Sequence, residues 1–226
     1  MAISIIVPCL NEADSIRETL AALAPLRARG AEVIVVDGGS SDGTVARATP
    51  HADCVIGALR GRASQMNAGA ARARGEILLF LHADALLPES ADALIVEALK
   101  QTRRGWGRFD VAISGSNPLL RVVAWLMNAR SRLTGIATGD QAIFATRSLF
   151  TAAGGYPGIA LMEDIALCKR LKRFGPPLCL RHRLIASGRR WEKHGVVRTI
   201  LLMWRLRLAY WLGADPGKLA VRYDRG

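Results

Sequence analysis

The chain has 226 residues, of which 50% are hydrophobic and 22% are charged, and its formal net charge is +12. This balance excludes a disordered chain, and the length suffices for one large domain with a substantial core. The basic residues are scattered from Arg17 to Arg225 without an interleaved aromatic platform, so we expect no nucleic acid as a partner. An anionic small substrate or an anionic membrane surface suits this distribution better, and an arginine-rich genome composition is the alternative explanation.

The four cysteines lie in or beside apolar segments and show no paired metal spacing; they are Cys9, Cys54, Cys168 and Cys179. This usage is typical of reduced thiols in a cytoplasmic protein. Residues 1–10 lack the basic start of a signal peptide, and no stretch of about 20 residues is free of charge, so we expect neither a secretion signal nor a spanning helix. The expected location is the cytoplasm, with peripheral contact at the inner face of the membrane left open.

Strand and helix patterns alternate through the first half of the chain. Short apolar runs predict strands at 3–7, 32–36 and 54–56, and helical patterns follow at 15–29, at 60–74 and from Pro88 to Lys100. The continuously apolar stretch from Glu76 to Asp84, EILLFLHAD, predicts a buried central strand. This alternation predicts a parallel, doubly wound sheet in an α/β fold.

Polar side chains follow these predicted strands directly. Ligands bind outside the carboxyl ends of parallel strands, so His82 and Asp84 indicate a site, although both could equally be solvated loop residues. Asp37 opens a turn, Gly38-Gly39-Ser40-Ser41-Asp42-Gly43-Thr44, whose backbone amides can approach a ligand. Its glycines do not follow the G-x-G-x-x-G spacing of dinucleotide-binding proteins. The turn therefore gives no support to the hypothesis that the protein is a dehydrogenase. Arg62 and Asn67, near the start of the next helix, suit a phosphate, although Arg62 could equally be a solvated surface residue.

The second half is less regular. Its patterns predict a strand at 109–114, helices at 118–132 and 162–174, and a strand at 142–145. Asp140, in Gly139-Asp140-Gln141, either orients a substrate or caps the turn before a strand. Glu163 and Asp164 open the last of these helices, where an acidic pair also has an ordinary explanation as cap and dipole complement. No linker or repeat divides the chain, so we expect a single domain.

The segment from Val196 to Leu212 predicts a C-terminal amphipathic helix with two apolar faces. At about 100° per residue, one face carries Val197, Ile200, Leu201, Trp204, Leu208 and Trp211. The opposite face carries Leu202, Met203, Leu206 and Tyr210, and the seams between the faces carry Arg198, Arg205 and Arg207. One face can pack on the domain. The other fits a membrane surface, a homodimer or a second packing surface, which composition does not distinguish.

Several of these motifs occur in a fixed order along the chain. They are Ile5-Ile6-Val7-Pro8 with Asn11-Glu12, Val35 to Thr44, Leu81-His82-Ala83-Asp84, Gly139-Asp140-Gln141 and Glu163-Asp164. From Ile3 to about Trp191 the chain resembles family 2 glycosyltransferases, and it looks closest to the short bacterial members with Leu-His-Ala-Asp in place of Asp-x-Asp. The resemblance implies a GT-A fold, with a mostly parallel central sheet flanked by helices. It implies one domain, 1–226, with a nucleotide-binding half (1–104), an acceptor and catalytic half (105–192) and a helical extension (193–226).

The resemblance also implies roles for individual residues. Asp164 matches the general base, with Glu163 beside it, and Asp84 matches the carboxylate that holds Mn²⁺ or Mg²⁺ on the diphosphate. The nucleotide pocket would be lined by Pro8, Asn11, Glu12, Asp37, Gly39, Asp42, Arg62, Asn67, His82 and Ala83. Contacts to the acceptor or the diphosphate would come from Asp140, Gln141, Arg190 and Trp191.

Two positions depart from the family pattern. His82 replaces the first aspartate of Asp-x-Asp, which puts metal affinity and donor preference in doubt, and Ser187 replaces the glutamine of Gln-x-x-Arg-Trp. We expect an inverting glycosyltransferase that uses a nucleotide-diphosphate sugar and an acceptor hydroxyl, with Asp164 as base and a metal at Asp84 for the leaving group. The alternatives are transfer to a polyprenyl phosphate at the membrane, a nucleotidyltransferase, and a nucleotide-sugar-binding module without turnover.

Overall fold

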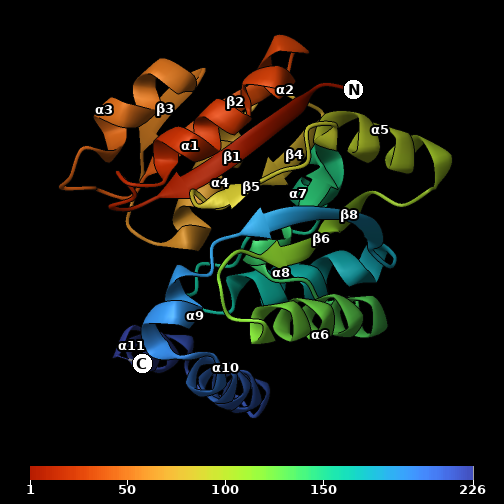
Figure 1. Cartoon of the computed structure of the whole chain (residues 1–226). Helices are drawn as coiled ribbons and strands as arrows, with labels where there is room; N and C mark the ends of the chain where they lie inside the picture. Colours follow the sequence, from red (N-terminus) through yellow and green to blue (C-terminus); the bar gives the residue numbers. More distant parts are fainter. Residues whose placement is uncertain (226) are drawn as a thin grey trace.

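An eight-stranded mixed sheet forms the centre of the molecule (Figure 1), in a computed structural model that describes residues 1–225 and side chains through Tyr223. The strands are β1 (Ile3–Cys9), β2 (Glu32–Asp37), β3 (Cys54–Gly57), β4 (Ile77–Phe80), β5 (Ala85–Leu86), β6 (Trp106–Ile113), β7 (Phe144–Thr146) and β8 (Leu178–Ala186). They lie in the order β3-β2-β1-β4-β7-β6-β8-β5. The first four are parallel, β7 is antiparallel to both neighbours, and β8 is parallel to β6 and antiparallel to β5. The predicted α/β fold with a mostly parallel sheet is confirmed.

Helices cover both faces of the sheet. They are α1 (Ile16–Ala22), α2 (Ala24–Ala28), α3 (Thr44–Ala48), α4 (Arg62–Arg72), α5 (Ala91–Gln101), α6 (Leu119–Thr134), α7 (Arg147–Ala152), α8 (Glu163–Leu171), α9 (Arg189–His194), α10 (Val196–Trp211) and α11 (Pro216–Arg225), with 3-10 turns η1 (Thr49–His51), η2 (Gly139–Gln141) and η3 (Lys172–Phe174). One face packs on α1, α2 and α5, and the other on α4, α7 and α8. Two hydrophobic cores result, one on each side of the strands.

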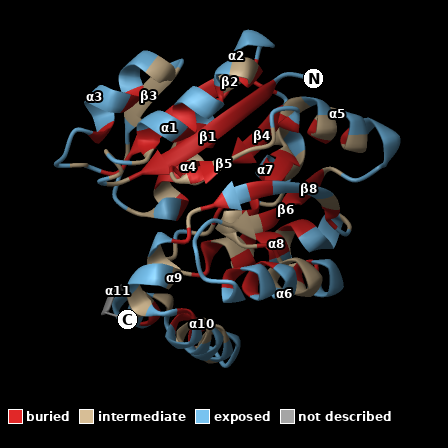
Figure 2. Ribbon diagram, viewed as in Figure 1, coloured by how far each residue is buried: buried red, intermediate tan, exposed pale blue. Residues whose placement is uncertain are grey.

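The strand β1 contributes to both cores. Ile5 and Val7 belong to the core that contains Leu20 of α1, whereas Ile6 belongs to the core that contains Met66 of α4. All three β1 side chains are fully buried. Figure 2 shows β1 in the colour of buried residues. A strand covered on both faces must be apolar at successive positions, which explains its unbroken hydrophobic sequence.

Several predicted elements have different bounds in the structure, and three of these differences have a clear physical reason or a consequence for the site. The helix predicted at 15–29 is two helices, α1 and α2, because Pro25 in the first turn of α2 has no amide hydrogen to continue α1. The central strand ends at Phe80, so the polar residues after it lie in a turn. The strand predicted from Ala142 starts at Phe144, because Ala142 has a left-handed backbone with φ of 46°.

The sequence patterns do not predict β5, β8, α7, α9 or α11. In β8, the residues Arg181, His182 and Arg183 interrupt the apolar run, and all three side chains are exposed. The strand nevertheless forms because its backbone pairs with β6 along most of its length. A tertiary contact therefore overrides the local pattern.

The C-terminal helix α10 uses one of its two predicted apolar faces within the fold. Leu206 packs with Met162, Ile165 and Leu219, and Leu202, Met203 and Tyr210 join this cluster. The face that carries Trp204 and Trp211 remains exposed. Within the described residues, no helix is long and apolar enough to cross a membrane.

Candidate functional site

A pocket of about 510 Å³ opens at the carboxyl ends of β1 and β4. The end of β1 and the loop after it supply Pro8 and Glu12, and the turn after β4 supplies His82, Ala83 and Asp84. Residues from later segments complete the lining, among them Arg60, Arg62, Gln65, Asp140, Arg189, Arg190, Trp191, Thr199, Met203 and Tyr223. The pocket thus brings together most of the residues predicted for a nucleotide, a metal and an acceptor, at the place where open α/β sheets bind ligands.

Two carboxylates in this pocket surround one positive charge. The Arg189 Nη2 atom lies 2.8 Å from Glu12 Oε2 and 3.1 Å from Asp84 Oδ2. Carboxylate oxygens placed around a cation are the ligand type that Mg²⁺ and Mn²⁺ prefer. No group of three or more metal-binding side chains occurs in the part of the chain that the structure describes. An ion held by Asp84 and Glu12 would therefore complete its shell with water or a bound phosphate.

His82 and Asp140 lie in contact on the wall of the pocket. The His82 Nδ1 atom lies 3.3 Å from Asp140 Oδ1. Gly139 permits this approach, because a Cβ atom there would lie 2.3 Å from His82 Nε2. The Asp140 side chain is half exposed, and although the surrounding protein opposes its ionisation, the bond to His82 and the positive charges of Arg62 and Arg130 hold its pKa below the ordinary value. Asp140 is therefore a carboxylate at neutral pH.

The acidic pair that begins α8 has the opposite electrostatic environment. Asp164 Oδ2 accepts a hydrogen bond of 3.0 Å from the Gly139 amide, and Oδ1 accepts one of 2.6 Å from the Ile165 amide. Burial raises the pKa of Asp164. Burial, together with the charge of Asp164, raises the pKa of Glu163 to about 6. The Gly139 amide connects this pair to the turn that carries Asp140.

Two arginines add positive charge to the pocket lining. Arg62, at the start of α4, is exposed at its surface, and although the surrounding protein opposes its ionisation, Glu163 and Asp164 are among the negative groups that raise its pKa overall. The Arg190 guanidinium carbon lies 3.6 Å from the centre of the Tyr223 ring, and Nη2 donates a 2.6 Å hydrogen bond to the Tyr223 carbonyl oxygen. This stacking attaches α9 to α11, which closes one side of the pocket.

The loops after β1 and β2 are joined beside the pocket. Burial opposes ionisation of Asp37, but hydrogen bonds from the Ser40 hydroxyl and, at 2.9 Å, from the amides of Ser40 and Gly39 lower its pKa. Asn11 Oδ1 accepts a 2.9 Å bond from the loop after β2, and Asp42 accepts a 3.2 Å bond from the loop after β1. Four of the predicted nucleotide contacts therefore lie in loops beside the pocket and not in its lining. They are Asn11, Asp37, Gly39 and Asp42.

The structure places Asn67 and Gln141 outside the pocket. The Asn67 amide donates to the carbonyl oxygen of Tyr156 at 2.8 Å and accepts from its amide at 3.0 Å. Gln141 is fully buried, accepts from the Thr138 amide at 3.3 Å and donates to Asn128 at 3.3 Å. Both side chains use their polar atoms to join segments of the fold.

Three further residues at the site are not indicated by the family motifs. Arg189 lies one position before the motif residue Arg190, and only the pairing of β5 with β8 brings it to Asp84. Gln65 donates to the carbonyl oxygens of Cys9, the last residue of β1, and Val36, near the end of β2, both at 2.8 Å. Arg130 is half-buried close to Asp164, and within the described residues its Nε and Nη2 atoms have no hydrogen-bond partner.

A family model described as glycosyl transferase family 2 matches residues 4–147, well over half of the chain. The chain belongs to this family. The predicted family and enzyme class are thereby confirmed, and the protein is a glycosyltransferase. The matched residues include β1 to β4 with their loops. The acidic pair at the start of α8 and Arg189 of α9 lie beyond the matched residues.

The curated relatives match this glycosyltransferase over a limited segment. A poly-beta-1,6-N-acetyl-D-glucosamine synthase from Staphylococcus aureus is 29% identical over 104 residues, which are 43% of this chain and 25% of the relative. The matched segment thus spans about a quarter of such relatives.

Solved glycosyltransferase structures share the fold. Residues 1–349 of S. aureus TarS with UDP-GlcNAc match with a TM-score of 0.68 and 18% identity, over 83% of this chain and 58% of that TarS chain. The mannosyltransferase PcManGT from Pyrobaculum calidifontis, with GDP-Man and Mn²⁺, matches with a TM-score of 0.64 and 24% identity, over 98% of this chain and 68% of that protein. These similarities confirm the predicted GT-A fold.

Proposed function

We propose that this glycosyltransferase moves a sugar from a nucleoside-diphosphate sugar to an acceptor hydroxyl with inversion, and that Asp164 is its general base. The observation that carries the proposal is the hydrogen bond from the Gly139 amide to Asp164, because it joins this carboxylate to the turn that brings Asp140 into the pocket. The pKa of Asp164 is raised and that of Asp140 is lowered, although the Gly139 amide bonded to Asp164 belongs to the turn that holds Asp140. A base is most effective when its pKa approaches the working pH, and an ionised neighbour can orient the hydroxyl.

The donor proposal rests on the pocket and on the fold relatives together. TarS was crystallised with UDP-GlcNAc and PcManGT with GDP-Man. In this chain, the joined loops that carry Asn11 and Asp37 would contact the base and ribose. Arg62 and Arg190 would contact the diphosphate, because a guanidinium group offers paired donors to phosphate oxygens.

Asp84 and Glu12 would hold a divalent cation on that diphosphate. PcManGT was crystallised with Mn²⁺ and a mycobacterial glucosyl-3-phosphoglycerate synthase with Mg²⁺. When bound, such an ion offsets the negative charge that develops on the leaving diphosphate. The two carboxylates around Arg189 fit this role in ligand type and charge.

The Asp164→Asn variant tests the base assignment. A thermal-shift screen of UDP, GDP, CDP and TDP sugars with Mn²⁺ first identifies the donor, because a ligand of the native state raises the melting temperature. Release of nucleoside diphosphate from that donor should then fall by roughly 10²- to 10⁴-fold in Asp164→Asn, with the donor-induced thermal shift retained. Glu97→Gln, on the exposed side of α5, is the matched control and should retain full activity. Full turnover by Asp164→Asn would refute the assignment, and no turnover by the unchanged chain with any bound donor would favour a binding module.

A further inference from the structure

Two neighbouring helices, α6 and α10, expose apolar stripes. On α10, Val197, Leu201, Trp204, Leu208 and Trp211 recur at helical spacing on one side, and Trp204 and Trp211 are 65% and 74% exposed. The opposite side of α10 is already used by the core cluster around Leu206. The core therefore does not use the exposed stripe of α10. Exposed apolar surfaces of this kind are typical of interaction sites.

The stripe on α6 continues this surface. Leu119, Val122 and Leu126 are exposed at helical spacing, and Trp125 beside them is 65% exposed. The two helices touch along a seam in which Leu120 and Val123 of α6 pack with Val196 and Ile200 of α10. At about 100° per residue, the exposed stripe on each helix lies directly beside the residues of this seam. Figure 1 shows α6 and α10 together at the end of the molecule farthest from α1 and α3.

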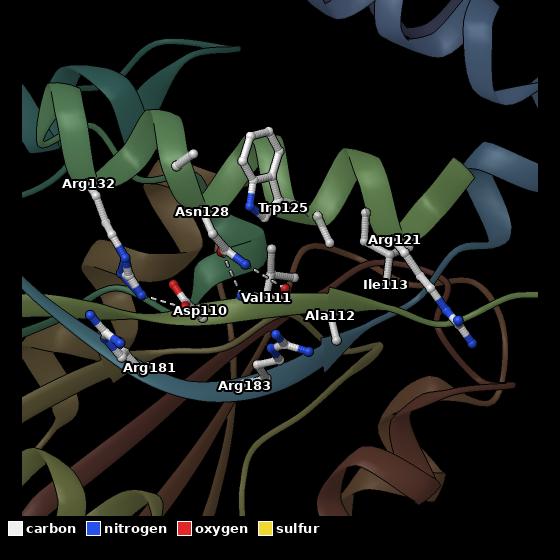
Figure 3. Close-up of a pocket in the computed structure, with 12 residues that line it drawn as sticks. Asp110, Val111, Ala112, Ile113, Arg121, Trp125, Asn128, Arg132, Arg181 and Arg183 are labelled. Atoms are coloured by element: carbon white, nitrogen blue, oxygen red, sulfur yellow. Dashed lines mark hydrogen bonds and ion pairs between the residues drawn. The ribbon is translucent and has the colours of Figure 1, made fainter. Parts of the chain in front are cut away.

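Basic side chains surround the apolar surface. Arg198 and Arg205 flank the stripe of α10, and both are exposed. Beside Trp125 lies a hollow of about 780 Å³, which is lined by Arg121 and Arg132 from α6 and by Arg181 and Arg183 from β8 (Figure 3). Asp110, the acidic residue of its lining, already pairs with Arg132 and with the buried Arg108. Among the described residues, Arg121, Arg181 and Arg183 form no ion pair, so the hollow is strongly positive.

The charge of this surface distinguishes between a lipid membrane and a second copy of the chain. A two-fold dimer would place the same patch against itself, and its arginines would face one another. Neither α6 nor α10 contains an aspartate or a glutamate that could pair with them. Like charges across an interface disfavour association, whereas an anionic surface attracts all of these arginines together.

We propose that the surface formed by α6, α10 and the arginine-lined hollow docks this protein on an anionic lipid membrane. Trp125, Trp204 and Trp211 would enter the interfacial layer, where an indole ring is stable with its apolar body among acyl chains and its N–H near water. The surrounding arginines would contact lipid phosphates, and the hollow would take a lipid headgroup. This proposal is independent of the donor chemistry, because it uses none of the pocket residues.

Vesicle co-sedimentation tests the proposal. The chain should bind vesicles that contain phosphatidylglycerol and should not bind vesicles of phosphatidylcholine alone, and high salt should release it because the attraction is electrostatic. The double variants Trp204→Ser/Trp211→Ser and Arg181→Glu/Arg183→Glu should each reduce binding by about tenfold or more. Their melting temperatures, compared with that of the unchanged chain, separate lost binding from misfolding.

The matched control removes the same charge elsewhere. Arg17→Glu/Arg72→Glu changes two exposed arginines on α1 and α4, in the opposite half of the chain, and should bind vesicles more strongly than Arg181→Glu/Arg183→Glu. Equal loss in both arginine variants would show that net charge alone drives binding and would overturn the assignment of this surface. A chain that ignores all vesicles, but forms a dimer that Trp204→Ser/Trp211→Ser dissociates in light scattering, would assign the surface to a second copy.

Discussion

The guanidinium group of Arg189 lies 3.1 Å from the carboxylate of Asp84, the residue that we propose as a metal ligand. The same nitrogen atom of Arg189 also bonds to Glu12. Arg189 thus neutralises two carboxylates that would otherwise repel each other across the pocket. A divalent cation and this arginine compete for the same oxygen atoms.

Removal of Arg189 should therefore strengthen metal binding. Arg189→Ala should bind Mn²⁺ up to about fivefold more tightly in the absence of nucleotide, because a partly exposed ion pair contributes about 1 kcal/mol or less. Titration calorimetry with Mn²⁺ measures the change, and Arg72→Ala, on the exposed side of α4, is the control. Weaker Mn²⁺ binding by Arg189→Ala would contradict the competition.

The acidic pair of α8 should make stability depend on pH. Glu163 has a pKa raised from 4.5 to about 6, so between these values the folded chain holds a proton that the unfolded chain has released. Stability should consequently fall as the pH rises through this window, by on the order of 1–2 kcal/mol, and remain lower above it. Glu163→Gln lacks this titration, so its free energy of unfolding should improve relative to the unchanged chain between pH 4.5 and about pH 7. Urea unfolding at both pH values measures the difference, and Glu97→Gln should show none.

The buried pair of Arg108 and Asp110 should be essential for stability. Arg108 is completely buried, and its carboxylate partner is Asp110, which also holds Arg132. Asp110→Ala would leave the Arg108 charge unpaired in the interior, which should lower the free energy of unfolding by about 3–5 kcal/mol. Asp14→Ala removes a carboxylate that is 96% exposed and should change it by less than about 0.5 kcal/mol. If urea unfolding gave the same loss of free energy of unfolding for Asp110→Ala and Asp14→Ala, the proposed role of the buried pair would be wrong.

Gly69 brings α4 close to the sheet. A Cβ atom at this position would lie 2.4 Å from the Cγ2 atom of Ile6 and 3.0 Å from that of Val36. Alanine inside a helix is normally favoured over glycine by about 1 kcal/mol, but the overlap with β1 outweighs this gain. Gly69→Ala should destabilise the chain by about 1–2 kcal/mol in thermal unfolding, whereas Gly158→Ala, which meets no atom within 4 Å, should have little effect.

The sequence predicts the first half of the fold better than the second. Strands such as β1 and β2 are buried on both faces, so their residues are apolar in unbroken runs that local patterns detect. In β8, Arg181 and Arg183 face solvent, and the segment forms a strand only because β6 lies alongside it. Such pairing is a property of the whole chain, which no local window contains.

The candidate site shows the same limit. Motif residues such as His82 and Asp84 follow the carboxyl end of a predicted strand. The sequence predicts their location because ligands in α/β folds bind at the carboxyl ends of the strands. The contacts that set their chemistry are distant in sequence. Asp164 meets Gly139 and Arg189 meets Asp84 through separate loops, and neither contact follows from residue spacing.

The short pairing of β5 with β8 has a consequence for folding. In this ladder Ala85 lies opposite Ala186. Ala85 directly follows Asp84, and Ala186 comes three residues before Arg189, so the ladder brings together Asp84 and Arg189, which are 105 residues apart along the chain. Closing so long a loop is slow, because its entropy is lost before any contact compensates for it. A nascent chain that ends before β8 would possess β1 to β4 and yet lack one wall of the pocket. Nucleotide binding during refolding would therefore report the last stage of assembly, when both ends of the sheet have joined.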